Sequence, residues 1–93
     1  MKTEILEKAS TFVIPTGSHQ LILHNDSHNE FTWVINCLMD VCKHSMTQAE
    51  QCTILTHQKG QCSIKVGAAE VLRELKTELI LRKLLVTIET NLN

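Results

Sequence analysis

Residues 20–24 read QLILH and residues 25–29 read NDSHN, so a short apolar run passes directly into five consecutive polar residues. An apolar run of this length beside turn-forming residues is typical of a buried strand. The polar residues favour turns and helix N-termini. We therefore expect a strand, a loop and then a helix, with Asn29 as the N-cap and Glu30 in the first turn, where the helix dipole favours negative charge.

Two helices are predicted after this loop. The first extends to about Lys43, because apolar residues recur at helical spacing, namely Phe31, Val34, Ile35, Leu38, Val41 and Cys42. The second begins at Ser45, which opens a stretch of capping-box form, and stops at Gly60, which suits the left-handed end of a helix. Its inner side is expected to consist of Ala49, Cys52, Thr53, Leu55 and Thr56.

The remaining residues predict a strand, a third helix and a last strand. Apolar and polar residues alternate at 62–66, which indicates a half-exposed strand. Helical spacing runs from Ala68 to about Lys83, and alternation resumes at 84–88, with no Gly or Pro to mark the boundary near Arg82. This order of elements predicts an α+β domain, in which three helices pack on one three-stranded antiparallel sheet.

The length of 93 residues allows one domain, and an apolar content of 43% fits a globular protein. Residues 1–18 mix charged and polar residues with the breaker PTGS at 15–18, so we expect a flexible N-terminal arm ahead of a domain at 19–93. Such an arm is either a plain terminus or a functional tail. The apolar island at residues 12–14 favours a functional tail.

The composition disfavours nucleic-acid binding and membrane insertion. Nine Lys and Arg stand against ten Asp and Glu, and Phe12, Phe31 and Trp33 are the only aromatic residues, so a basic groove with stacking platforms is not expected. No apolar run approaches the roughly 18 residues that cross a bilayer, and the N-terminus lacks a signal-peptide pattern. We therefore expect no nucleic-acid partner, no membrane partner and a cytoplasmic location.

The four cysteines, Cys37, Cys42, Cys52 and Cys62, have no C-x-x-C spacing and match no zinc ribbon. Each stands where a small apolar residue would suit the periodicity, and a free buried cysteine behaves as a small hydrophobe. We therefore expect four structural thiols, with a metal or redox role as the alternative.

An enzyme is disfavoured, because no nucleophile elbow, phosphate-binding loop or H-E-x-x-H pair is present. His24 and His28 flank a turn that leaves their relative direction open, so we expect no metal and no cofactor. The polar loop and His57 are the notable features. Each has a plain structural interpretation, as a strand-to-helix connection and as a helix C-terminal histidine, and a functional one as part of a binding site on a rigid base.

The order of these motifs resembles that of the ClpS family. The matching stretches are LILHND at 21–26, THQKGQC at 56–62, AAEV at 68–71 and LLVTIE at 84–89, so the resemblance spans about Gln20 to Glu89. Proteins of this family are adaptors that deliver polypeptides with destabilising N-terminal residues to an ATP-dependent Clp protease. The resemblance implies the same non-enzymatic adaptor function for this chain.

The resemblance also implies the site residues. In the family, an Asn and an acid of the first loop and the His of the second helix hold the α-ammonium of the substrate, whose three donors need three acceptors. Asn25 and His57 match by position, with Asp26 and Ser27 beside them. The pocket for the first side chain would be lined by Phe31, Val34, Thr53 and Leu84. Because a neutral imidazole accepts the hydrogen bond, binding is expected to weaken when His57 is protonated.

Three of these positions depart from the family. Ser27 replaces an acid that assists the ammonium, and Phe31 and Thr53 each replace a pocket Met, so the substrate preference stays open. The family docks on the N-domain of the Clp ATPase through its N-terminal arm and an acid of the third helix, which Glu70 matches. Ser27 also favours a second hypothesis, an interaction module of the same fold that docks on a Clp ATPase or another partner without recognising N-terminal residues.

Overall fold

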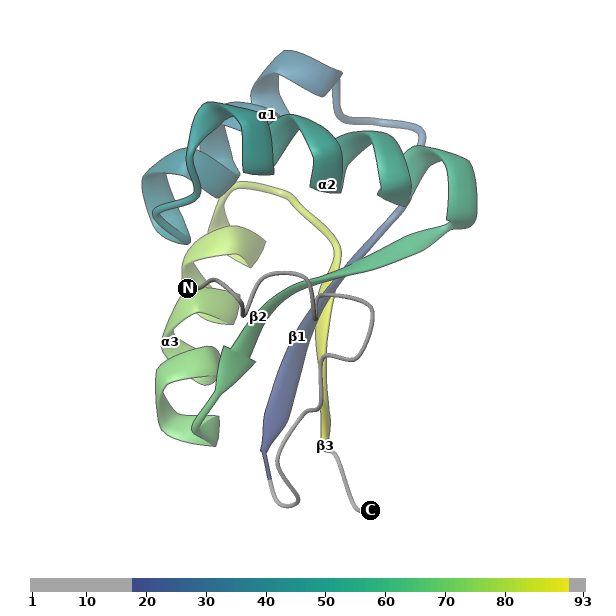
Figure 1. Ribbon diagram of the computed structural model, residues 1–93. Coiled ribbons are helices and arrows are strands. Elements are labelled where there is room, and N and C mark those ends of the chain that lie inside the picture. Colours follow the sequence, from purple (N-terminus) through teal and green to yellow (C-terminus); the bar gives the residue numbers. More distant parts are fainter. Residues whose placement is uncertain (1–17, 91–93) are drawn as a thin grey trace, which may run out of the picture.

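The computed structural model describes residues 18–90, which contain three strands and three helices (Figure 1). The strands are β1 (His19–His24), β2 (Gln61–Gly67) and β3 (Val86–Thr90), and the helices are α1 (Phe31–Val41), α2 (Met46–Lys59) and α3 (Ala69–Leu81). β1 lies in the middle of the sheet and pairs antiparallel with both β2 and β3. The predicted fold class is confirmed. The predicted arm lies outside the described residues except for Ser18.

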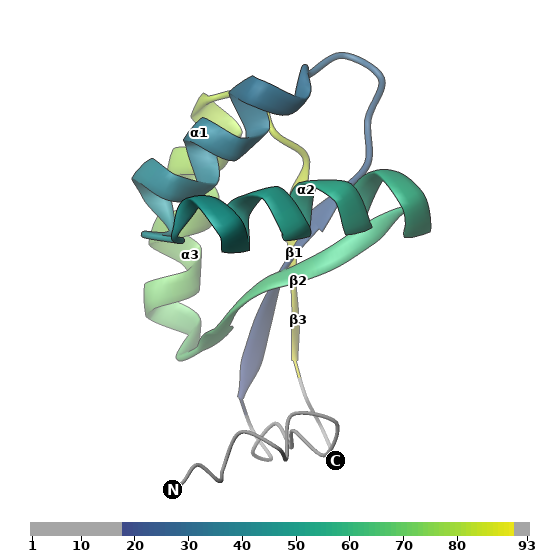
Figure 2. The ribbon, with the colours of Figure 1, turned by 45° about the horizontal axis from the view of Figure 1, so that its top comes forward.

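The helices and the sheet enclose a single core. Figures 1 and 2 show α1 and α2 across the end of the sheet where β1 finishes and β2 begins, with α3 along the flank. Leu21 and Leu23 project from the same face of β1, since side chains alternate along a strand, and both are fully buried. Leu38 of α1 and Leu72 and Leu79 of α3 pack in the same cluster. The central strand is therefore fixed by the core immediately before the polar loop begins.

Both ends of α2 follow from local sequence signals. The Ser45 side chain accepts a hydrogen bond from the Gln48 amide at 3.1 Å, which satisfies one free donor of the first turn. Gly60 has a φ of 94°, a left-handed conformation that glycine adopts without steric penalty. The predicted start and stop of this helix are confirmed.

The start of α1 differs from the prediction. Its N-cap is Glu30, and no side chain caps the helix. Asn29, the predicted cap, instead donates from its side chain to the Lys83 carbonyl at 2.9 Å and to the Asp26 carboxylate at 3.0 Å. The prediction for Asn29 was wrong because a distant backbone carbonyl and a neighbouring carboxylate use its amide group. The helix also ends at Val41, two residues before the predicted limit.

The end of α3 is made without glycine. Lys83 takes a φ of 74°, its amide donates to the Ile80 carbonyl at 2.9 Å, and the Leu84 amide donates to the Leu79 carbonyl at 3.0 Å. These two bonds form a Schellman motif, which terminates a helix through one left-handed residue. The last strand accordingly begins at Val86 and not at the predicted residue 84.

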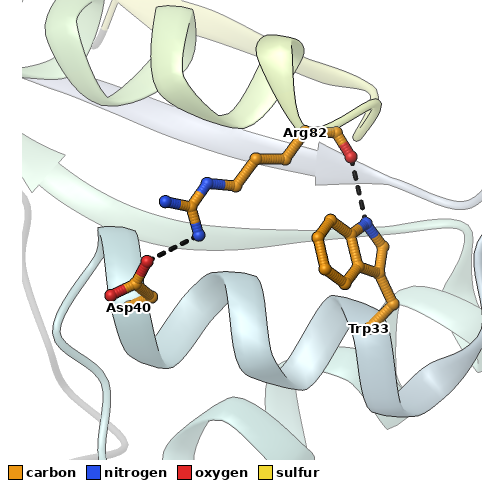
Figure 3. Close-up of polar contacts among 3 residues, drawn as sticks. All are labelled: Trp33, Asp40 and Arg82. Carbon is orange, nitrogen blue, oxygen red and sulfur yellow. Dashed lines mark hydrogen bonds and ion pairs between the residues drawn. The ribbon is translucent and has the colours of Figure 1, made fainter.

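Two contacts from α1 support this helix end. The Trp33 indole N–H donates to the Arg82 carbonyl at 3.0 Å, and the Arg82 guanidinium pairs with Asp40 at 2.6 Å (Figure 3). Helix carbonyls near a C-terminus have no partner inside the helix, so an outside donor stabilises them. The residues that follow α3, including Leu84, are therefore held against α1.

Candidate functional site

A pocket of about 230 Å³ lies where β1, α1, α2 and the segment after α3 meet. It is lined by all eight residues that the sequence assigned to the N-terminus site and the side-chain pocket: Asn25, Asp26, Ser27, Phe31, Val34, Thr53, His57 and Leu84. Leu23, His24, Asn29 and Thr56 complete the lining. The structure thus brings the predicted residues together, and their roles in binding remain a prediction.

Backbone hydrogen bonds place Asn25 beside the end of α2. The Asn25 amide donates to the Gly60 carbonyl at 2.9 Å, and the Gly60 amide donates to Thr56 at 2.9 Å to close the last turn of the helix. His57 lies in that same turn and is exposed to solvent. On the other side of β1, the His24 amide donates to the Leu85 carbonyl at 2.9 Å. The start of the polar loop is therefore attached to both neighbouring segments of the sheet.

The carboxylate of Asp26 organises the loop itself. Its Oδ1 accepts hydrogen bonds from the backbone amides of His28 at 2.8 Å and Asn29 at 3.0 Å, and its Oδ2 accepts from the Asn29 side chain. Burial raises the pKa of Asp26, but the hydrogen bond from the His28 amide and those from Asn29 outweigh this effect, so the pKa lies below its ordinary value. Asp26 is thus a fixed negative charge in the pocket wall, while Ser27 is exposed beside it.

The inner wall of the pocket is mainly apolar. Leu84 and Thr53 are each only 4% exposed, and Val34 is half-buried. The Thr53 hydroxyl donates to the Ala49 carbonyl at 2.8 Å, and the Thr56 hydroxyl donates to the carbonyl four residues earlier at 2.7 Å. Both hydroxyl hydrogens are used inside α2, so this wall presents no free hydroxyl donor to a ligand.

An aromatic pair joins α1 to α2 at the rim. The rings of Phe31 and His57 meet in a T-shaped arrangement, with centroids 5.4 Å apart and planes at 73°. Such edge contacts are favourable because the positive edge of one ring meets the negative face of the other. Phe31 is 44% exposed, so its ring lies at the pocket entrance and not in the core.

Four lining residues were not predicted. Thr56 had a usable signal, because it lies three residues after Thr53 and so on the same face of α2. His24 enters the lining from the end of β1, and its Nε2 lies 2.7 Å from the Thr87 hydroxyl of β3. Asn29 enters through its bond to Lys83, which no local pattern indicates.

The predicted docking residue lies elsewhere. Glu70 is exposed in the first turn of α3 and is not among the residues that line the pocket. A docking surface there would be separate from the pocket, so a partner on α3 and a ligand in the pocket would not compete for the same side chains.

The pocket combines hydrogen-bond acceptors at one side with an apolar wall at the other. Asn25, Asp26 and His57 can accept hydrogen bonds, and Val34 and Leu84 can contact an apolar group. Within residues 18–90, no three His, Cys, Asp or Glu side chains gather closely enough to hold a metal ion. In that same range, none of the helices has both the length and the apolar character needed to cross a membrane. A pocket with acceptors on one side and an apolar wall on the other suits a small cationic group that carries an apolar substituent.

Comparison with known proteins gives consistent results. Residues 15–84 match the family described as "ATP-dependent Clp protease adaptor protein ClpS". The ClpS adapter protein of Gloeobacter violaceus is 32% identical over 71 residues, which cover 75% of this chain and 76% of that protein. The structure of Agrobacterium tumefaciens ClpS2 bound to L-phenylalaninamide has a TM-score of 0.74 at 20% identity, over 81% of this chain and 98% of that chain, and supports the fold. The chain belongs to the ClpS family, whose members are adaptors of the ATP-dependent Clp protease and not enzymes, as the sequence motifs predicted.

Proposed function

We propose that this adaptor binds the free N-terminus of polypeptides that begin with a large apolar residue and delivers them to the Clp protease. The proposal rests on one observation: the acceptors Asn25, Asp26 and His57 and an apolar wall line the same pocket. An α-ammonium and the first side chain leave the same carbon atom, so a site for both must place acceptors next to an apolar cavity. The pocket has that composition.

The charge of the ammonium is matched by Asp26. Two acidic residues, Asp26 and Glu30, lie near Ser27 in the sequence and could replace the acid that is missing there. Asp26 lines the pocket and its pKa is lowered by hydrogen bonds from the loop, after the opposing effect of burial, so it is ionised at neutral pH. Glu30 is exposed and does not line the pocket. Asn25 and His57 would supply the directed acceptors, and Asp26 the negative field.

The first side chain would enter the space between Val34 and Leu84, with Thr53 on the α2 side. A pocket of about 230 Å³ offers room for an apolar side chain. The ligand of Agrobacterium tumefaciens ClpS2, L-phenylalaninamide, carries an ammonium group and an apolar ring on neighbouring atoms. That chemistry corresponds to the two halves of the pocket in this chain.

A peptide titration tests the proposal. Peptides that begin with Phe or Leu, and their N-acetylated forms, are titrated into the full 93-residue chain by calorimetry. Free peptides are expected to bind and acetylated ones to lose at least about tenfold in affinity, because acetylation removes the charge and leaves the acceptors that the bound peptide covers without a charged donor. Equal affinity for both forms would contradict the proposal.

Matched variants assign the roles. Asn25→Ala and His57→Ala are each expected to weaken binding by more than about 1 kcal/mol, since each removes an acceptor from a charged donor. His28→Ala is the control, because His28 belongs to the same loop and its side chain does not line the pocket. Normal binding by both pocket variants would refute the assigned roles.

The proposal also includes a surface that docks on the Clp ATPase. We infer that the chain contacts the N-domain of the Clp ATPase through Glu70 and through residues 1–18, which lie outside the described residues apart from Ser18. Glu70 is exposed in the first turn of α3, so it is accessible to a partner. Glu70→Lys should weaken co-purification with the isolated N-domain, whereas Glu78→Lys at the other end of α3 should not. A cytoplasmic location is part of the proposal.

The second candidate function is that of an adaptor that docks on the Clp ATPase without recognising the N-terminal residues of other polypeptides. It is favoured by Ser27, which brings no charge where the family has an acid. This alternative predicts that the chain binds the N-domain while neither the free nor the acetylated peptide binds the pocket. The titration above therefore separates the two functions.

A further inference from the structure

Two threonines of α2 line the pocket, and both are buried. Thr53 is 4% exposed and Thr56 is 5% exposed. They lie three positions apart and therefore on the same face of the helix. A buried hydroxyl in a mainly apolar wall is costly unless it is hydrogen-bonded. The hydrogen bonds of these two groups therefore determine which first side chain suits the wall.

Each hydroxyl uses its hydrogen inside the helix. Thr53 Oγ1 donates to the Ala49 carbonyl at 2.8 Å, and Thr56 Oγ1 donates to the Cys52 carbonyl at 2.7 Å. A hydroxyl has one hydrogen and two lone pairs, so each oxygen keeps its capacity to accept a hydrogen bond. Among the hydrogen bonds of residues 18–90, none has either oxygen as its acceptor. Because each hydrogen points at a helix carbonyl, the lone pairs point away from that carbonyl.

Thr53 lies one helical turn from the groups assigned to the ammonium. The Asn25 amide donates to the Gly60 carbonyl at 2.9 Å and His57 lies in the last turn of α2, so both are at the C-terminal end of the helix. Thr53 lies four positions before His57, which is about 6 Å along the helix axis. Thr56 is the residue next to His57, and it is therefore closer to the ammonium end. A long side chain that enters from beside His57 would bring its far end near Thr53.

We propose that the pocket selects an N-terminal tyrosine over a phenylalanine, with Thr53 Oγ1 accepting a hydrogen bond from the phenol hydroxyl. This preference rests on the proposed function, since it concerns the first residue of the same peptides. Tyrosine combines an apolar ring, which suits Val34 and Leu84, with one donor at its tip. Phenylalanine would fill the same space and cover the Thr53 oxygen with carbon, which removes water from an acceptor without replacing its hydrogen bond.

The expected preference is moderate in size. Both the phenol and the pocket lose water on binding, so tyrosine is expected to bind roughly three- to tenfold more tightly than phenylalanine. A fully apolar pocket would give the opposite order, because burying a phenol hydroxyl without a partner costs free energy. The direction of the difference therefore distinguishes a pocket that offers an acceptor from one that does not.

The test compares two peptides that differ by one hydroxyl group. Peptides of otherwise identical sequence that begin with Tyr or Phe, and the N-acetylated form of each, are titrated into the full 93-residue chain by calorimetry. Thr53→Val keeps a branched side chain of similar shape and removes the acceptor, so the preference for Tyr should disappear or reverse. Thr53→Ser retains the hydroxyl and should keep the preference.

Thr77→Val is the matched control. The Thr77 hydroxyl also donates to a carbonyl four residues earlier, that of Arg73 at 3.0 Å, but Thr77 lies in α3 and does not line the pocket. This variant loses the same kind of bond within a helix and should keep the wild-type ratio of the two affinities. Circular dichroism verifies the fold of each variant.

The outcomes separate this preference from the proposed function. Equal affinities of the free Tyr and Phe peptides for wild type, or tighter binding of the Phe peptide, would overturn the preference and leave the proposed function intact. If neither free peptide binds, or if acetylation has no effect, the proposed function fails and the preference fails with it. A wild-type ratio in folded Thr53→Val would overturn the role of Thr53. The wild-type ratio decides the preference even if Thr53→Val does not fold.

Discussion

The rings of Phe31 and His57 lie 5.4 Å apart in a T-shaped contact that joins the first turn of α1 to the last turn of α2. His57 is exposed, so this contact restricts an imidazole that would otherwise rotate in solvent. An acceptor that must point at an ammonium benefits from such a restriction, because less side-chain freedom is lost on binding.

Replacing the ring at position 31 should therefore weaken peptide binding. Phe31→Ala is expected to lower the affinity for a peptide beginning with Phe by about 1 kcal/mol, which is the scale of an aromatic edge contact. Phe31→Met, which keeps apolar bulk at the rim, should lose less. Calorimetric titration of the three proteins measures the difference. Unchanged affinity of the alanine variant would show that the ring does not orient His57.

Removing the side chain of Asn29 should destabilise the fold. Its amide group joins the polar loop to the Lys83 carbonyl at 2.9 Å and to Asp26 at 3.0 Å, so Asn29→Ala leaves both acceptors without this donor. We expect a loss of about 1–2 kcal/mol in the free energy of unfolding, measured in urea. Asn36→Ala, at an exposed position of α1, is the control and should change stability little. Equal stabilities of the two variants would contradict the role of Asn29.

Asp26 should contribute stability that depends on pH. Its pKa is lowered in the folded protein, where hydrogen bonds from His28 and Asn29 outweigh burial, so its contribution is complete above the ordinary pKa of an aspartate. The contribution is lost as the pH falls through the lowered value. Asp26→Asn should therefore be less stable than wild type by about 1 kcal/mol at neutral pH, and the gap should close towards about pH 2.

Urea unfolding at several pH values measures that gap. Glu50→Gln, at an exposed position of α2, is the control and should stay close to wild type throughout. A difference between Asp26→Asn and wild type that persists unchanged in acid would show that charge is not the cause.

Glycine at position 83 should stabilise the protein. Lys83 has a φ of 74°, a left-handed conformation that is unfavourable for a residue with a Cβ atom. Lys83→Gly is expected to raise the free energy of unfolding by about 0.5–1 kcal/mol. Lys76→Gly, inside α3, should lower it by about 1 kcal/mol, since glycine is a poor helix former. Thermal unfolding of the two variants measures both changes. If Lys83→Gly were less stable than wild type, the lysine side chain would contribute more stability than its left-handed backbone conformation costs.

Elements whose ends are set by nearby residues were predicted well. α2 begins and ends as expected because Ser45 and Gly60 act within one turn of the helix that they limit. The end of α3 could not be predicted, because Lys83 adopts the conformation of a glycine and two donors from α1 and the polar loop reach its last carbonyls. These two donors lie 54 and 49 positions away in the sequence from the carbonyls that they reach, so no local pattern indicates them.

In the candidate site too, residues beside local sequence signals were predicted, and residues fixed by distant contacts were not. Asn25 and His57 were found because each lies beside a strong structural signal: Asn25 directly follows a buried strand, and His57 precedes the glycine that stops a helix. Asn29 was assigned to the wrong role, since an Asn before a helix is normally read as a cap. Its true partner, Lys83, becomes a neighbour only after the domain has folded.

Two consecutive amides at the end of β1 donate in opposite directions, from His24 to Leu85 and from Asn25 to Gly60. The loop therefore leaves the sheet from a point that is held on both sides before any ligand arrives. A peptide that docks here would meet groups already in place, so association should resemble rigid docking with little loss of chain entropy. Differences among substrates should then appear in how long each remains bound, and much less in how fast each arrives.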